Sequence, residues 1–274
     1  MPPRAQRLYP RMRERPPEFV VNPAWPWYGA LLCYIGPRSA VDAQTRIYDC
    51  TGKLIFTTST GVSRPYSYDN RIYRHVIDFR NQTRSYLSTI QVTQPLQITV
   101  FFWQSDFTIS ANGCPFAWEV LNTFGFSFWD SSTGSWWLDV YSPSKGTFSL
   151  SGLYTNPPHV FAARVRLGQQ NIFVNGRQTS AAYNMQYGST NVFIGSRSGS
   201  YFYNGVLSDI TIVGAWIPDD HLIQVSDPSN VDLRIGGIPL ILPPRRRLWP
   251  VAPVAEYVKR RQLGLRAGSR EVVT

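Results

Sequence analysis

Three tryptophans gather around one predicted turn, and an exposed tryptophan can bind a sugar. The segment FWDSSTGSWWLD, residues 128–139, places Trp129 before the turn SSTG and Trp136 and Trp137 after it. An indole has a large apolar face on which a sugar ring can stack. Adjacent strand residues point to opposite sides, so at least one of Trp136 and Trp137 is expected to fill the core. Two interpretations stay open: core packing, or a sugar-stacking site at Trp129 and Trp136.

Carboxylate catalysis has little support in the globular part. Retaining glycosidases hold two carboxyl groups roughly 5 Å apart. Of the five glutamates, only Glu119 lies between residues 25 and 242, so a pair of core glutamates is excluded. We interpret Asp130 and Asp139, which flank the predicted turn, as turn and edge residues. The chain is therefore expected not to be an enzyme.

Other reactive residue types also lack a functional pattern. The three histidines form no metal-binding motif, and no nucleophile elbow or phosphate-binding loop occurs. The cysteines are not spaced as metal ligands or as a CxxC pair, and we expect reduced, buried thiols. They are Cys33, Cys50 and Cys114. The sequence predicts no catalytic residue, no metal and no cofactor, and no apolar run is long enough for a membrane span.

Between residues 25 and 242 the chain consists of short β-branched and aromatic runs separated by turn signals. Runs at 74–79, 84–90 and 96–104 predict strands, and Asn175-Gly176 predicts a tight hairpin. The alternating run 205–213 predicts a half-buried strand that closes the sandwich. A single short helix is expected after Pro218. The pattern predicts an all-β fold, a two-sheet sandwich or jelly roll.

The positive charge is concentrated at the two ends of the chain. Residues 1–18 hold five Arg and two Glu, a net of +3, and residues 243–274 hold seven Arg, one Lys and two Glu, a net of +6. The remaining 19–242 hold 14 basic and 13 acidic residues, a net of +1. A nucleic-acid-binding domain usually carries its basic patch on the fold. We therefore divide the chain into an extended arm at 1–24, a domain at 25–225 and a basic arm at 226–274.

The two arms combine arginine with apolar residues, which suggests docking on a partner. Apolar anchors can enter grooves while Arg pairs with acidic groups. Contact of the arms with DNA is the less favoured alternative. We expect an assembly that holds both arms, with copies of this chain or other proteins as partners. The predicted docking residues are Arg4, Arg7, Arg11, Arg13, Arg15, Arg245, Arg246, Arg247, Trp249, Tyr257, Lys259, Arg260 and Arg261.

Several segments resemble one known family. The series IFVNGRQ (172–178), VFIGS (192–196) and FYNGVLSDITIVGAWIPDDHLIQV (202–225) is similar to the C-terminal half of concanavalin A-like, laminin-G-like domains. The segments 46–60 and 75–88 are similar to its first half. This resemblance implies a concanavalin A-like jelly roll of two sheets. Some members bind calcium through an Asp-Asp pair, and Gln82 and Thr83 stand in its place here, so no calcium site is expected.

The segment SDPSNVDLRIGGIPLILPPRRRLWP, residues 226–250, resembles the region that follows such domains in proteins of tailed bacteriophages. This resemblance implies a non-enzymatic virion protein, assembled in the host cytoplasm. A capsid decoration (cement) protein, a homo-oligomer whose arms dock on the major capsid protein, is the preferred hypothesis. The alternative is a neck- or tail-associated carbohydrate-binding module that contacts a glycan of the host surface.

Overall fold

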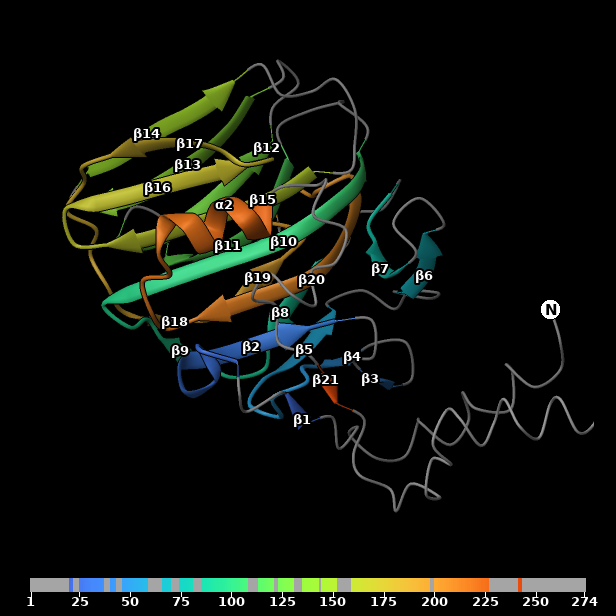
Figure 1. Cartoon of the computed structure of the whole chain (residues 1–274). Helices are drawn as coiled ribbons and strands as arrows, with labels where there is room; N and C mark the ends of the chain where they lie inside the picture. The colour runs from blue at the N-terminus through green and yellow to red at the C-terminus, as the bar shows by residue number, and fades with distance from the viewer. Residues whose placement is uncertain are drawn as a thin grey trace, which may run out of the picture.

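The protein is a sandwich of two antiparallel sheets (Figure 1). The structure is a computed structural model that describes residues 20–21, 25–36, 40–42, 46–58, 66–69, 74–80, 85–107, 113–120, 123–130, 135–142, 144–151, 159–197, 200–226 and 241–242. Almost every described element is a strand, which confirms the predicted all-β class. Within these residues, no helix has the length and apolar character needed to cross a membrane.

The first sheet has eight strands. Its order is β17-β16-β15-β10-β20-β7-β6, and β2 also pairs with β20. The strands are β2 (Leu31–Ile35), β6 (Tyr66–Asp69), β7 (Arg74–Asp78), β10 (Gln97–Phe107), β15 (His159–Arg166), β16 (Gln169–Val174), β17 (Arg177–Ala181) and β20 (Gly205–Val213). The turn between β16 and β17 has Asn175 at φ 49° and Gly176 at φ 76°. Positive φ at both positions suits a two-residue hairpin turn, so the predicted hairpin is confirmed.

The second sheet has nine strands in the order β14-β13-β12-β11-β19-β8-β5-β4-β3. The strands are β3 (Ala40–Asp42), β4 (Arg46–Tyr48), β5 (Ile55–Thr58), β8 (Tyr86–Ser88), β11 (Gly113–Val120), β12 (Phe124–Asp130), β13 (Ser135–Ser142), β14 (Ser144–Ser151) and β19 (Phe193–Ile194). A separate pair, β9 (Val92–Thr93) with β18 (Ser189–Thr190), completes this part of the fold. Strand β8 is shorter than the run at 84–90 predicts.

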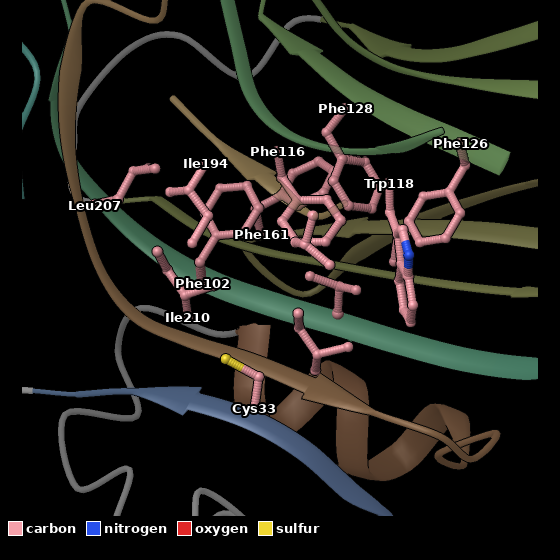
Figure 2. Close-up of a cluster of buried hydrophobic side chains, with 14 of the residues drawn as sticks. Cys33, Phe102, Phe116, Trp118, Phe126, Phe128, Phe161, Ile194, Leu207 and Ile210 are labelled. Carbon is pink, nitrogen blue, oxygen red and sulfur yellow. The ribbon is translucent and has the colours of Figure 1, made fainter. Parts of the chain in front are cut away.

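Aromatic side chains fill the space between the two sheets. Phe161 lies 5.1 Å from Phe102, 4.8 Å from Phe128 and 5.1 Å from Trp136, measured between ring centroids. Figure 2 shows Phe116, Phe126 and Phe128 gathered above β10, which carries Phe102. All of these rings are fully buried. Tight packing of large rings makes the two sheets one rigid support for the residues on their outer faces.

A second apolar cluster covers the outer face of the eight-stranded sheet. It includes Phe101, Trp103 and Phe173 from the strands and Leu222 from helix α2 (Asp219–Ser226), and Figure 1 shows α2 lying across β15 and β16. Strand β20 is consequently buried on both faces and lies between β10, β2 and β7. The prediction of a half-buried closing strand is wrong, because all nine residues of β20 are buried and the face that alternation assigned to solvent belongs to the apolar cluster with Leu31 and Tyr34.

The first and last strands of the described residues pair in a short ladder. Strand β1 (Val20–Val21) pairs antiparallel with β21 (Ile241–Leu242), with Val20 opposite Leu242. Because the two strands are antiparallel, the first residue of β1, Val20, and the last residue of β21, Leu242, lie at the same end of the pair. The predicted docking residues of both arms lie outside the described residues.

Candidate functional site

The outer face of the nine-stranded sheet, turned away from the core, carries aromatic and polar side chains together. Along β11, β12 and β13, alternate residues point into the core and the others point outward. The inward set is apolar and includes Trp118, Phe128 and Trp136. The outward residues are Ala117, Glu119, Ser127, Trp129, Trp137, Asp139 and Tyr141. This face is the candidate site.

Three aromatic rings form a cluster on this face. Trp129 and Trp137 are opposite each other on β12 and β13, and their rings stack at 6.0 Å with an interplanar angle of 12°. Tyr201 meets Trp129 edge-on at 5.1 Å. Trp129 is 4% exposed and Tyr201 is 55% exposed, while Trp137 is half-buried. Tyr201 and Trp137 therefore present aromatic surface to solvent, with Trp129 packed against both.

Tyr201 is held in an unfavourable backbone conformation. Its φ of 52° is left-handed, which a bulky residue rarely adopts. The preceding residues Arg197 and Ser200 exchange two backbone hydrogen bonds of 2.8 Å, and the amide of Cys114 donates to the carbonyl oxygen of Tyr201 at 3.1 Å. Such strain costs about 1–3 kcal/mol and clusters at functional sites. The surrounding hydrogen bonds fix Tyr201 with its ring exposed.

A buried ion pair braces this loop against the sheet. Arg197 donates from Nε to Oε1 of Glu119 and from Nη2 to the hydroxyl of Tyr141. Ser127 Oγ donates to Glu119 Oε2 at 3.0 Å, and Trp129 Nε1 donates to Ser127 Oγ at 3.0 Å. Burial raises the pKa of Glu119, and the charge of Arg197 opposes that rise. The network links the Tyr201 loop to the ring of Trp129.

Two carboxylates share this face, and both have partners. Asp139 is buried in the middle of β13, and Thr147 Oγ1 donates to its Oδ1 at 2.7 Å. The prediction that Asp139 is a turn or edge residue is wrong, because β13 extends well past it and packs between β12 and β14. Glu119 is held by Arg197 and Ser127. Among the described residues, no group of three or more His, Cys, Asp or Glu could hold a metal ion.

The structure separates the two tryptophans predicted to stack on a sugar. Trp136 is fully buried in the sandwich core, so its indole is inaccessible and that assignment is corrected. Trp129 belongs to the cluster but is covered. The residues that expose aromatic surface are Trp137 and Tyr201, which the sequence did not single out. Strand alternation indicated that one of Trp136 and Trp137 faces outward, whereas nothing in the sequence placed Tyr201 beside them.

Comparison with known proteins finds relatives by structure alone. No family model matches the chain, and no curated protein matches it by sequence. The receptor-binding domain of a botulinum neurotoxin C/D mosaic serotype matches with a TM-score of 0.53 at 10% identity, over 71% of this chain and 50% of that one. The binding domain of botulinum neurotoxin DC in complex with SialylT matches with a TM-score of 0.51 at 10% identity, over 71% and 50%.

A third match is to botulinum neurotoxin type C, whose cell entry depends on interaction with two ganglioside molecules. It has a TM-score of 0.51 at 10% identity, over 71% of this chain and 50% of that one. The chain thus spans about half the length of these neurotoxin chains. The protein has their kind of β-sandwich fold. At this identity the likeness shows the fold alone; one of the matched structures is described as a receptor-binding domain.

Proposed function

We propose that this chain is a non-catalytic carbohydrate-binding domain, with its glycan site at Trp137 and Tyr201. The observation that carries the proposal is the exposed, left-handed Tyr201 beside the Trp129–Trp137 stack. A strained backbone that exposes a large ring has no benefit for core packing, but it creates a platform for a ligand. The neurotoxin domains of similar fold interact with gangliosides and with SialylT, which supports the same class of ligand here.

The geometry suits stacking of a sugar ring on an aromatic surface. A sugar has a face of C–H groups that can pack on Trp137, and the edge-on ring of Tyr201 adds an apolar wall and a hydroxyl. The Glu119–Arg197 pair keeps these rings in place before the ligand arrives. Because little ordering is then needed on binding, more of the stacking energy is available as affinity.

Replacing either exposed ring is expected to weaken glycan binding about tenfold, since each stack contributes on the order of 1 kcal/mol or more. The variants are Trp137→Ala and Tyr201→Ala, and titration calorimetry with the best ligand from a glycan array measures the change. Tyr28→Ala removes a ring that is 43% exposed but lies outside this face, and serves as the matched control. Undiminished binding by both site variants would refute the proposal.

We also propose that the arms attach this domain to a larger particle, as expected for a virion protein. The ladder of β1 with β21 supports this role, because it places Val20 and Leu242, which adjoin the two basic segments in the sequence, opposite each other. The segments 1–18 and 243–274 hold +3 and +6, a net of +9, whereas residues 19–242 hold a net of +1. Deleting residues 243–274 is expected to abolish co-sedimentation with particles while the β-sandwich stays folded by circular dichroism. Normal incorporation of the truncated chain would contradict this role.

A further inference from the structure

Two large apolar side chains stand at the turns that close one end of the sandwich. Leu96 is 72% exposed and Leu167 is 67% exposed, the two highest values among the large apolar side chains in the described part of the chain. Leu96 directly precedes β10, and Leu167 directly follows β15. Because Gln97 on β10 lies opposite Arg166 on β15, the two leucines leave their strands at the same end and lie side by side. We call this exposed pair the leucine tip.

The turn that carries Leu167 is of a kind that usually holds polar residues. Leu167 and Gly168 connect β15 to β16 as a two-residue hairpin turn, and Gly168 has a φ of 70°. Gly, Asn, Asp and Ser dominate such turns, because they tolerate the backbone conformation and remain in contact with water. A leucine at the apex contributes nothing to the core. Its side chain is instead available to an apolar partner outside the protein.

A basic group without a carboxylate partner lies next to these leucines. Arg166 directly precedes Leu167, and its cross-strand neighbours are the uncharged Gln97 and Gln169. Arg166 donates from Nε to Oε1 of Gln169 at 3.1 Å and from Nη2 to the same oxygen. Among the residues that the structure describes, no carboxylate lies within ion-pair distance of Arg166. The positive charge of Arg166 is therefore available to an external anion.

An indole holds the guanidinium of Arg166 in place. The centroid of the half-buried Trp216 ring lies 4.1 Å from the guanidinium carbon of Arg166 and 4.1 Å from that of Arg164. Arg164 is buried and paired with Asp219, so Arg166 is the one of these two cations that keeps an uncompensated charge. Trp and Arg, which combine an apolar body with a polar end, suit the boundary between lipid and water.

The leucine tip lies away from the candidate glycan site. The carbonyl oxygen of Trp118, near the end of β11, accepts a hydrogen bond from Nε2 of Gln94, which is two residues before Leu96. Trp129 lies instead beside the beginning of β11, on the neighbouring strand β12. The two surfaces are therefore at opposite ends of the same strands and can be tested separately.

We propose that the leucine tip binds the surface of an anionic lipid bilayer. Leu96 and Leu167 enter the outer part of the acyl region, while Arg166 pairs with headgroup phosphates. Such contact is made with one face of the bilayer and needs no membrane-spanning segment. A protein partner fits less well, because a specific interface buries roughly 800 Å² on each side, more than two turn residues supply. Insertion into a fluid lipid surface has no such requirement.

The experiment is co-sedimentation of the full chain with sugar-free vesicles of phosphatidylcholine, alone or with about 30% phosphatidylserine. The measurement is repeated in about 0.5 M NaCl, where attraction of the basic segments to the vesicles is screened. There, Leu96→Ser combined with Leu167→Ser is expected to weaken binding about tenfold or more, because both inserted side chains are lost. Ile223→Ser is the matched control and should bind like the native chain, since Ile223 is 40% exposed but belongs to α2.

Replacement of Arg166 tests the role of charge at the leucine tip. Arg166→Gln should weaken binding to the phosphatidylserine vesicles about fivefold at low salt, which is the contribution of one basic residue near an anionic surface. It should have little effect on vesicles of phosphatidylcholine alone. Equal losses on both kinds of vesicle would contradict the pairing of Arg166 with anionic lipid.

The outcomes decide the proposal independently of the glycan site, because the vesicles hold no sugar. Full binding by the double leucine variant would assign vesicle binding to the basic segments and overturn the proposal. Absence of sedimentation with both kinds of vesicle would overturn it as well. If the native chain then self-associates in analytical ultracentrifugation and the double variant does not, the leucine tip is a protein contact instead. None of these results would alter the prediction that Trp137→Ala weakens glycan binding.

Discussion

Replacing Glu119 with alanine is expected to lower the free energy of unfolding by about 3–5 kcal/mol. The variant leaves the guanidinium of Arg197 buried without its carboxylate, and it removes an acceptor of Ser127 as well. A buried charge that loses its partner keeps the cost of dehydration without the compensating attraction. Urea denaturation, followed by tryptophan fluorescence, measures the change.

A double variant distinguishes loss of the pair from loss of packing. Glu119→Leu combined with Arg197→Met removes both charges and keeps apolar volume, so it should recover a large part of the lost stability. The same double variant should still weaken glycan binding, because the Tyr201 loop loses the side-chain bonds from Arg197 to the sheet. A stability loss below about 1 kcal/mol for Glu119→Ala would show that this pair behaves as an exposed one.

Gly125→Ala is expected to destabilise the fold by about 4 kcal/mol or more, or to prevent folding. Gly125 on β12 has a φ of 98°, and a Cβ there would collide with the carbonyl oxygen of Trp118 and lie 2.6 Å from the Cα of Glu119. Both obstacles are backbone atoms of the adjacent strand, so they cannot move without separating β11 from β12. The measurement is the thermal unfolding midpoint, or the yield of soluble chain if the variant does not fold.

Gly52→Ala is the matched control for this prediction. Gly52 also has a positive φ, 72°, but no atom lies within 4 Å of the Cβ that alanine would add. Gly52→Ala should therefore lower the free energy of unfolding only by the cost of holding alanine in the left-handed backbone conformation, about 1–2 kcal/mol. Similar losses of stability for Gly125→Ala and Gly52→Ala would show that the positive φ, and not the close approach of β11, is the reason that position 125 requires glycine.

Local patterns in the sequence were sufficient for the elements and the class of the fold. Runs of β-branched and aromatic residues form strands because they suit a pleated, half-buried backbone. Asn175-Gly176 forms a tight turn because both residues tolerate positive φ. The uneven charge is also a property of the sequence alone: basic residues concentrate in the terminal segments and are missing from 85–144. None of these features depends on which strands become neighbours.

Only the tertiary structure decided which side of each strand is buried and which residues form the site. Alternation separates Trp136 from Trp137 but does not say which one faces the other sheet. It also could not show that β20 is buried on both faces, since Leu31 and Tyr34 of the cluster on its outer face are distant from it in the sequence. Arg197 and Glu119 are 78 positions apart and pair only because β19 lies beside β11. Strand pairing is set by packing of the whole core, so a face built from several strands cannot be assigned from any one of them.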